Sequence, residues 1–174
     1  MERVLIIGNC GSGKSTFAKA LAKATGLPLV HLDRLHWVGN WEARPREEFD
    51  ALLQQELEKP RWIIDGNFSR TMEHRLRYCD TVFFLDLPPL VCLWGVIRRM
   101  ITDYGRTRED MGGNCPEKLD KAKLEFFKST LQYNRRSRSK YYGYLEAQKG
   151  IRVIIFKNRR QIKQYLKKIT QPSL

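Results

Sequence analysis

The chain has 174 residues, of which 42% are hydrophobic and 29% are charged, a composition typical of a single globular domain with its own core. No apolar run approaches the ~20 residues of a membrane helix, and residues 4–7 lead straight into a glycine-rich loop, so we expect neither a membrane span nor a signal peptide. The four cysteines form no C-x-x-C pair and the three histidines lack ligand spacing with them, which argues against a zinc site and favours the cytoplasm.

The net charge of +13 lies entirely in the second part of the chain. Residues 98–174 hold 20 of the 32 Lys and Arg but only 7 of the 19 Asp and Glu, whereas residues 1–97 are balanced. Such asymmetry indicates a polyanionic partner, which could be substrate phosphates, nucleic acid or both. A basic face that contacts only water is the alternative.

The first motif follows the apolar residues 4–7. Residues 8–15 read Gly-Asn-Cys-Gly-Ser-Gly-Lys-Ser and fit G-x-x-x-x-G-K-[ST] at every fixed position, ahead of the helix-forming run 16–24. A strand, a glycine-rich loop and a helix in this order predict a phosphate cradle that binds ATP. Lys14 would reach the β- and γ-phosphates, and the Ser15 hydroxyl would ligate Mg²⁺. The expected nucleotide-binding residues of this loop are Gly8, Asn9, Cys10, Gly11, Ser12, Gly13, Lys14, Ser15 and Thr16.

Short apolar runs alternate with helical patterns along the rest of the chain. Strands are predicted at residues 3–7, 29–32, 62–64, 81–85 and 152–156. Helices are predicted at residues 14–24, 45–58, 69–78, 89–101, 116–142 and 160–169, and the apolar side of 89–101 is expected to pack in the core. This order predicts an α/β fold: a three-layer α/β/α P-loop NTPase with a five-stranded parallel sheet, formed by residues 1–174 as one domain.

A carboxylate follows the second predicted strand. Asp33 precedes a loop with two tryptophans, Trp37 and Trp41. At the carboxyl end of a strand, Asp33 could hold a phosphoryl acceptor or deprotonate its hydroxyl, while the tryptophans could stack on a flat ligand. Packing at the sheet edge explains these residues about equally well.

Mg²⁺ binding requires a carboxylate at the end of a strand beside the phosphate loop. Asp65 and Asp86 both follow buried apolar runs. We favour Asp65, because Gly66 and Asn67 form a tight turn after it and Arg70 follows closely. Asp86 precedes two prolines and could simply orient that turn.

Residues 102–115 contain three glycines, two arginines and little apolar content, between two predicted helices. This composition predicts a small mobile lid over the phosphate site, with an ordinary surface loop as the alternative. The planar guanidinium group of arginine can bind two phosphate oxygens at once and stabilises the charge that develops during phosphoryl transfer. The candidates near the lid are Arg98, Arg99, Arg106, Arg108, Arg135, Arg136 and Arg138, of which we select Arg106, Arg108 and Arg135 as catalytic together with Lys14 and Asp33.

Asn158 and Arg159 follow the last predicted strand. The loop after the last strand of such a sheet lies near the phosphate loop, so these two residues are predicted to contact the nucleotide base. A helix cap is the alternative for Asn158.

The motifs together resemble the adenylate-kinase-like branch of P-loop proteins. Residues 62–71 look like that group's strand-Asp-Gly-Phe-Pro-Arg-Thr segment with one residue inserted and without the proline. This resemblance implies a Mg²⁺ role for Asp65 and an acceptor-side catalytic role for Arg70, although the insertion changes how Arg70 would be aimed.

A closer resemblance, over nearly the whole chain, is to bacterial DNA topology modulation proteins. The matching segments are 31–33 with the Trp37…Trp41 loop, 64–67, 104–108, 110–118 and 157–159. It implies an adenylate-kinase-like fold and ATP binding, and the family name suggests an effect on DNA.

Two functions follow from these features. The first is a small-molecule phosphotransferase that moves the ATP γ-phosphoryl to a nucleotide or another small acceptor. The second is an ATP-dependent protein whose basic half makes nonspecific, salt-dependent contacts with DNA, since the sequence has no recognition motif. We favour the phosphotransferase, because a lid and its arginines suit closure over a small site.

Overall fold

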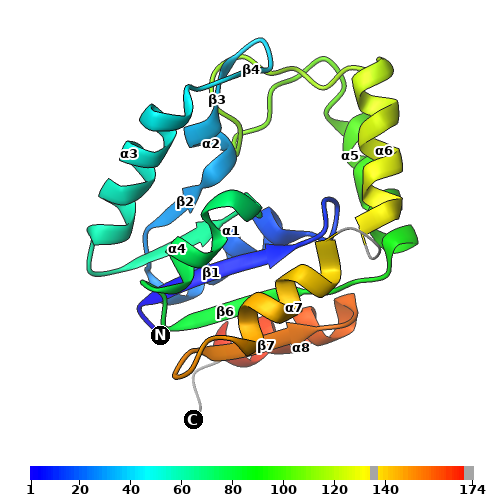
Figure 1. The fold of residues 1–174 in the computed structure, drawn as a ribbon. Helices are drawn as coiled ribbons and strands as arrows, with labels where there is room; N and C mark the ends of the chain where they lie inside the picture. The colour runs from blue at the N-terminus through cyan, green and yellow to red at the C-terminus, as the bar shows by residue number, and fades with distance from the viewer. Residues whose placement is uncertain (134–136, 171–174) are drawn as a thin grey trace.

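The computed structural model describes residues 1–133 and 137–170. Its centre is a five-stranded sheet of β1 (Arg3–Gly8), β2 (Leu29–His31), β5 (Trp62–Asp65), β6 (Thr81–Leu85) and β7 (Arg152–Phe156). The strand order is β2-β5-β1-β6-β7, and every neighbouring pair is parallel (Figure 1). The predicted five-stranded parallel sheet is confirmed, and its central strand leads directly into the phosphate loop.

Helices cover both faces of this sheet. On one face, α3 (Arg46–Glu58), α4 (Met72–Leu76) and α7 (Ser139–Glu146) pack against the apolar cluster that contains Leu5 and Ile7. On the other face, α1 (Lys14–Thr25) and α8 (Arg159–Thr170) pack against the cluster that contains Val4 and Ile6. Successive β1 side chains therefore enter opposite cores, as expected of a strand buried on both sides.

The chain between β2 and α3 forms small elements that the sequence pattern did not predict. The second strand ends at His31, and Asp33 lies in the short helix α2 (Leu32–His36) instead of following the strand directly. Two short strands, β3 (Trp37–Gly39) and β4 (Glu42–Ala43), then form an antiparallel hairpin. Elements this short carry no readable period, because five residues span barely more than one helical turn.

The single helix predicted at 116–142 is wrong. The structure has α6 (Lys121–Tyr133) and then α7, and residues 134–136 between them lie outside the described part of the chain. Pro116 is not in a first helical turn; its carbonyl accepts a hydrogen bond from the Trp41 indole at 3.0 Å. Glu117 instead pairs its backbone with Gly105 and Arg106, so these backbone groups are not available for a helix.

The helix α5 (Pro89–Thr102) is less buried than its apolar pattern predicts. Cys92 and Val96 are buried, but Leu90, Trp94 and Ile101 are 72%, 62% and 66% exposed, so the prediction that this stripe packs in the core is wrong. Helix α5 stands at the side of the sheet and packs against α6 rather than lying across a sheet face (Figure 1). In the described residues, no helix is long and apolar enough to cross a membrane.

The segment of residues 103–120 crosses above the sheet and connects the α5–α6 pair with the β3–β4 hairpin (Figure 1). At one end it continues from α5 and leads into α6. In the middle it contacts the β3–β4 hairpin, where the Asn40 amide donates to the Asn114 carbonyl at 2.6 Å. We call residues 103–120 the bridging segment; it contains most of the predicted lid and closes a ring of chain around the phosphate loop.

Candidate functional site

The phosphate loop has the backbone geometry that its glycines allow. Gly11 has φ +74, and a Cβ placed on it would come within 2.0 Å of the Cys92 carbonyl oxygen. Gly13 has φ +97, a left-handed backbone conformation that glycine adopts without strain, and it lies immediately before α1. The loop therefore leads directly into the N-terminus of that helix. Side chains at these positions would push the loop away from α5 or strain the turn.

Two side chains of this loop have unusual environments. The Lys14 ammonium donates to the Asn9 carbonyl at 3.0 Å, so it lies over its own loop. The Ser12 hydroxyl is buried and makes no hydrogen bond within the described residues. A buried hydroxyl without a partner is costly, and a phosphate oxygen in the loop would supply the missing acceptor.

Asparagine side chains fasten the loop to the rest of the fold. Asn67 accepts from the Gly8 amide at 3.0 Å and donates to the Gly8 carbonyl at 2.7 Å. Asn9 donates to the Thr130 carbonyl of α6 at 2.9 Å. The turn that holds Asn67 is itself held by the buried Arg75, which donates to the carbonyls of Gly66, Asn67 and Phe68. The entry of the loop is thus fixed by three separate elements.

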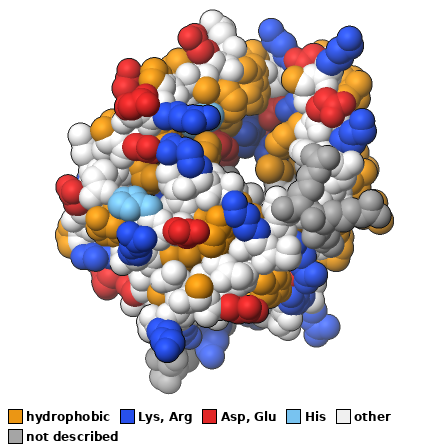
Figure 2. Space-filling view, viewed as in Figure 1, with side chains coloured by type: hydrophobic (Ala, Val, Ile, Leu, Met, Phe, Trp, Pro, Cys, Tyr) orange, Lys and Arg blue, Asp and Glu red, His pale blue; other side chains and the backbone are white. Residues whose placement is uncertain are grey.

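A large cavity of about 1490 Å³ opens above the loop. The hollow is visible near the centre of the space-filling view, with Lys and Arg side chains beside it (Figure 2). Its walls come from the phosphate loop, α2, the hairpin, the turn after β5, α5, the bridging segment and the first turns of α6 and α8. One cavity therefore connects the predicted nucleotide site with the predicted acceptor residues.

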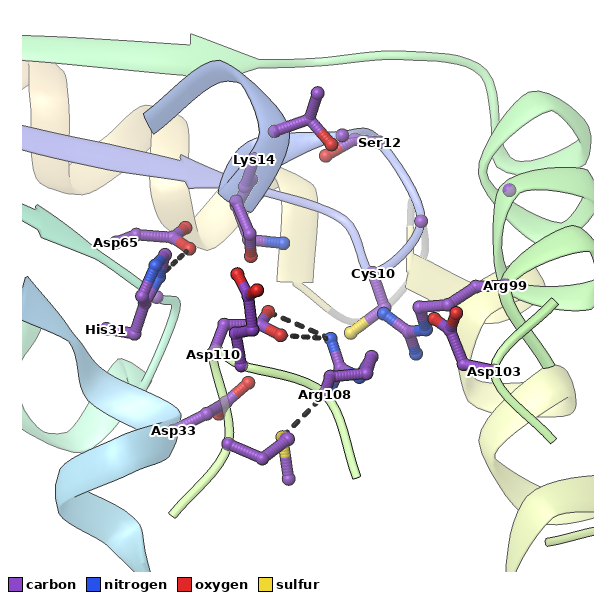
Figure 3. Close-up of a pocket in the computed structure, with 18 of the residues that line it drawn as sticks. Cys10, Ser12, Lys14, His31, Asp33, Asp65, Arg99, Asp103, Arg108 and Asp110 are labelled. Carbon is purple, nitrogen blue, oxygen red and sulfur yellow. Dashed lines mark hydrogen bonds and ion pairs between the residues drawn. The ribbon is translucent and has the colours of Figure 1, made fainter. Parts of the chain in front are cut away.

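Two carboxylates that the sequence singled out lie in this cavity (Figure 3). Asp65 ends β5, and its Oδ2 lies 2.9 Å from His31 Nδ1, while its Oδ1 is buried without a partner in the described residues. Asp33 lies on α2, where burial and the nearby charge of Asp65 raise its pKa, against the opposing charges of Arg108 and Lys14. A partly buried carboxylate with a raised pKa is typical of groups that exchange protons.

The donor set at this point of the cavity suits Mg²⁺. Ser15 and Asp65 offer hard oxygen atoms, and the partnerless Oδ1 of Asp65 lacks the counter-charge that a cation would provide. Among the described residues, no three His, Cys, Asp or Glu side chains are grouped to hold an ion. Mg²⁺ fits that arrangement, because it takes few protein ligands and completes its shell with water and phosphate oxygens.

The bridging segment brings charged side chains toward the phosphate loop. Arg108 Nη1 donates to both carboxylate oxygens of Asp110, at 3.1 and 2.9 Å, and Asp110 lines the same cavity as Lys14 (Figure 3). Burial opposes ionisation of Asp110, but the charge of Arg108 and a hydrogen bond from Ser15 outweigh it and lower the Asp110 pKa. Lys19 of α1 also pairs with Glu109 at 2.7 Å. The segment is therefore tied to α1 by charged contacts.

The other predicted site residues that the structure describes fall into two groups, those that line the cavity and those that do not. Arg106 and Arg159 line the cavity, as do the phosphate-loop residues from Cys10 to Thr16. Arg70 does not: its guanidinium pairs with both oxygens of Asp50, at 2.8 and 2.6 Å, on the exposed side of α3. Asn158 accepts from the Gln161 amide at 3.0 Å, the cap geometry named as its alternative. Arg135 lies outside the described residues.

Asp86 has a different role from Asp65. Its carboxylate accepts hydrogen bonds from Arg138 at 2.8 Å, Lys157 at 2.5 Å and the Tyr142 hydroxyl at 2.7 Å. Asp86 does not line the cavity. Burial raises its pKa, but these three donors outweigh burial and lower the pKa to about 2. Asp86 thus joins the chain after β6 to α7 and to the end of β7.

Four further residues, to which the sequence analysis gave no functional role, contribute to the site. Asp110 and Glu117 face the arginines, His31 faces Asp65, and Asn67 holds the phosphate loop. Their sequence signal is weak, since a single Asp, Glu, His or Asn in a loop has no spacing that points to a partner far along the chain. Only the paired position of His31 opposite Asp65 in neighbouring strands brings those two side chains together.

Comparison with known proteins agrees with this geometry. The model of the ATPase family associated with various cellular activities (AAA) matches residues 4–85, which run from β1 to β6. The match covers less than half of the chain and includes the phosphate loop between the central strand β1 and helix α1.

The chain is also similar to the crystal structure of a shikimate kinase from Bacteroides thetaiotaomicron. The two are 21% identical, with a TM-score of 0.54 over 97% of this chain and 95% of the other. At this identity the likeness concerns the fold alone. No curated protein matches the sequence.

Proposed function

We propose that this protein is an ATP-dependent phosphotransferase that transfers the γ-phosphoryl group to a small-molecule acceptor. The supporting observation is the single cavity of about 1490 Å³ that holds the phosphate loop, Asp33, Asp65 and the arginines of the bridging segment. A phosphotransferase needs a triphosphate cradle, an acceptor space and cations around the moving phosphoryl group within one enclosed site.

In this proposal the triphosphate lies in the phosphate loop and Lys14 leaves the Asn9 carbonyl to contact the β- and γ-phosphates. The cavity continues along α8, where Arg159, Ile162, Lys163 and Leu166 form its wall. The two aliphatic side chains and Arg159 suit the flat face of an adenine base, so Arg159 is retained of the two predicted base contacts. Asn158 is engaged as a helix cap and is left out of this role.

Ser15 and Asp65 would hold Mg²⁺, which screens the charge on the β- and γ-phosphates when bound. Asp33 would accept the proton of an acceptor hydroxyl, whose oxygen attacks the γ-phosphorus as the bond to the β-phosphate oxygen breaks and ADP leaves. The raised pKa of Asp33 supports this role, because a base with a pKa closer to the operating pH accepts a proton more readily. A phosphate acceptor, such as a nucleoside monophosphate, would depend less on Asp33 and more on the arginines.

The acceptor would lie on the side of the cavity away from α8. Trp37 and Trp41 of the hairpin, with Phe68 after β5, line that side. The Trp37 and Trp41 rings pack edge to face with centroids 5.5 Å apart. Such a surface accommodates the flat face of a base or a sugar-like ring. Closure of the predicted lid, residues 102–115, over the two substrates of this single domain would exclude water.

The test is ATP turnover by the purified protein with Mg²⁺, with and without nucleoside monophosphates, nucleosides, small sugars and small acids. Stimulation by one acceptor, with a phosphorylated product, is the expected result. Slow hydrolysis that no acceptor changes but that DNA stimulates would overturn the proposal. It would favour the narrower resemblance to DNA topology modulation proteins and their suggested action on DNA.

A double substitution separates these two functions further. Arg106→Ala with Arg108→Ala should slow phosphoryl transfer by roughly 10³-fold if the arginines serve the active site. If they serve DNA, the same change should flatten the salt dependence of DNA binding and leave turnover intact.

A further inference from the structure

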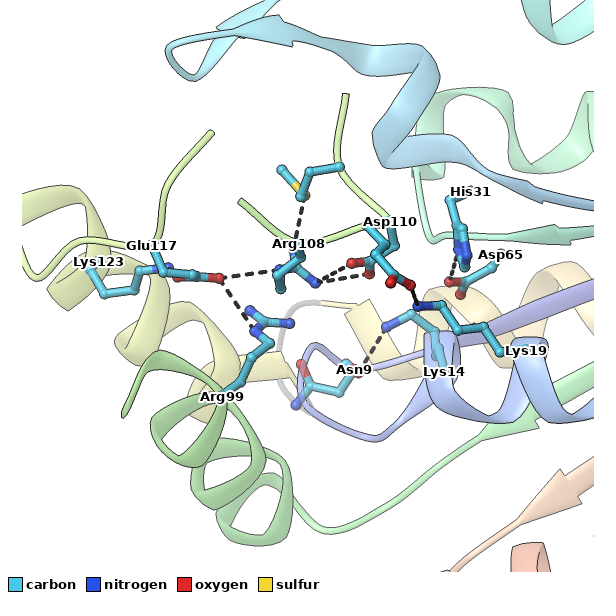
Figure 4. A network of polar contacts seen from close by, with 12 residues as sticks. Asn9, Lys14, Lys19, His31, Asp65, Arg99, Arg108, Asp110, Glu117 and Lys123 are labelled. Atoms are coloured by element: carbon cyan, nitrogen blue, oxygen red, sulfur yellow. Dashed lines mark hydrogen bonds and ion pairs between the residues drawn. The ribbon is translucent and has the colours of Figure 1, made fainter. Parts of the chain in front are cut away.

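One buried carboxylate, Glu117, gathers side chains from three separate elements. Its side chain is 1% exposed and pairs with Arg99 of α5, Arg108 of the bridging segment and Lys123 of α6 (Figure 4). Arg99 Nε and Arg108 Nε each lie 3.4 Å from the same oxygen, Oε1, while Lys123 pairs with Oε2. Two guanidinium groups therefore meet at a single carboxylate oxygen.

The backbone of Glu117 is fixed as well. Its amide donates to the Arg106 carbonyl at 3.0 Å, and its carbonyl accepts from the Gly105 amide at 2.9 Å. These bonds pair the end of the bridging segment with its beginning. The backbone that carries the carboxylate is thus fixed between α5 and α6 by hydrogen bonds within the bridging segment itself.

Without this carboxylate the two guanidinium groups would repel each other. Burial and the charge of Arg108 lower the pKa of Arg99, and Glu117 opposes that shift. Their Nε atoms face Glu117, which leaves the outer Nη atoms for other partners. Arg108 donates from Nη1 to Asp110 and from Nη2 to the Met111 sulfur at 2.9 Å, whereas Arg99 makes no side-chain hydrogen bond with any residue in the described ranges.

The cluster carries a surplus of positive charge beside the phosphate loop. Three cations face two carboxylates, in the pairs Arg99–Glu117, Arg108–Glu117, Lys123–Glu117 and Arg108–Asp110. Arg99 lines the cavity and lies next to Cys10 of the phosphate loop (Figure 3). A phosphate group supplies the missing negative charge, and its oxygens match the planar fork of a guanidinium.

We propose that Glu117 is a positioning residue that holds Arg99 and Arg108 side by side so that both guanidinium groups contact the terminal phosphate of ATP. Arg108 would exchange its contacts with Asp110 and Met111 for phosphate oxygens. The inference rests on the proposed binding of ATP and adds Arg99 to the residues that contact it. Glu117 itself touches no substrate, and it acts through the two arginines.

The test compares the affinities of the wild type and of Glu117→Gln for MgATP and MgADP by calorimetry, without any acceptor. The quantity measured is the ratio of the ADP dissociation constant to the ATP dissociation constant. Loss of one negative charge alone would raise this ratio, because ATP carries more negative charge than ADP. Loss of arginine position lowers it, because only ATP has the terminal phosphate. We expect a fall of about tenfold, equivalent to about 1.4 kcal/mol.

The matched control is Asp86→Asn, which removes another buried carboxylate with several cationic or hydroxyl partners, away from the cavity. Its ratio should equal that of the wild type even though it loses stability. An unchanged or increased ratio in folded Glu117→Gln would overturn the inference.

Arg99→Lys is the second variant, because it keeps the charge and removes the fork. It decides the question where Glu117→Gln does not fold: a lowered ratio supports the inference, and a wild-type ratio overturns it. A wild type that binds ATP and ADP equally would overturn this inference alone. A wild type that binds neither nucleotide would overturn the proposed function as well.

Discussion

His31 and Asp65 lie opposite each other at the ends of two parallel strands, with His31 Nδ1 2.9 Å from Asp65 Oδ2. The contact fixes one carboxylate oxygen and leaves Oδ1 buried, with no partner among the residues that the structure describes. Asp65 and Ser15 line the same cavity. A histidine that orients a carboxylate in this way leaves its second oxygen for a cation.

The first prediction concerns Asp65. Asp65→Asn should raise the Mg²⁺ concentration needed for half-maximal ATP turnover by about tenfold, because the amide offers Mg²⁺ no negative charge. Titration of turnover with Mg²⁺ at fixed ATP measures this. The control is Asp50→Asn, which removes an exposed carboxylate outside the cavity and should leave the Mg²⁺ requirement unchanged. An identical requirement in both variants would remove Asp65 from the proposed Mg²⁺ site.

The second prediction concerns Lys14. Lys14→Ala should reduce ATP turnover by at least about 10²-fold, because the loop loses the lysine whose ammonium group would contact the γ-phosphate during transfer. Its one hydrogen bond in the described structure is to the Asn9 carbonyl, so the melting temperature should change little. Turnover and thermal unfolding are measured on the same preparations. The control is Lys23→Ala, on the exposed side of the same helix. Full activity of Lys14→Ala would contradict the assignment of the phosphate loop.

The third prediction concerns the pH dependence of Asp33. Because its folded pKa is raised, its charged form is disfavoured by folding, and this cost appears as pH rises above the ordinary value of 3.8 and through the folded pKa. Asp33→Asn should therefore be more stable than the wild type at neutral pH. With a hydroxyl acceptor it should also be about 10²-fold slower and lose the acidic limb of the pH–rate profile.

Denaturant unfolding at pH 7 and pH–rate profiles check both parts. A retained acidic limb in Asp33→Asn would exclude this residue as the base. It would then favour a phosphate acceptor.

The fourth prediction concerns Asp86. Its pKa of about 2 means that it stabilises the fold above the unfolded value of 3.8 and that this contribution disappears as pH falls through about 2. Asp86→Asn should cost about 1–2 kcal/mol at pH 7, discounted because its partners Arg138 and Lys157 are partly exposed, at 40% and 49%. Urea unfolding measured between pH 7 and pH 2 should show the two proteins converging at the acid end. A constant difference across that range would contradict the assignment.

The fifth prediction concerns the contact between the hairpin and the bridging segment. A Cβ on Gly112 would lie 2.0 Å from the Trp37 carbonyl oxygen and 2.6 Å from that of Arg34, so Gly112→Ala must move the segment away from the hairpin. The KM for the acceptor should rise by roughly tenfold, with a smaller change in ATP affinity, because the acceptor side of the cavity opens.

The matched control is Gly143→Ala in α7, where a Cβ meets nothing within 4 Å. This change should be neutral or stabilise by up to about 1 kcal/mol. Equal effects of the two substitutions on acceptor KM would show that the hairpin contact does not shape the site.

The sequence by itself determined the sheet, the phosphate loop and the order of the main helices. Apolar runs buried on both faces predict parallel strands, and a glycine-rich loop between a strand and a helix predicts its own conformation, because its signals are local. The register of β1 with β5 and β6 then brings Asp65 to the same edge as that loop. Strand direction places Asp86 at that edge as well, and the turn Gly66-Asn67 with Arg70 behind it is what distinguished Asp65 in the sequence.

Only the tertiary structure decided which charged residues share the site. Arg70, Arg99 and Arg108 look alike in the sequence, yet Arg70 pairs with Asp50 outside the cavity, while Arg99 and Arg108 meet at Glu117. The same limitation led to the wrong helix at 116–142, since the pairing of Glu117 with residues 105 and 106 competes there with helix formation. A charged side chain takes the nearest opposite charge in space, and that distance is fixed by packing between segments far apart in the chain.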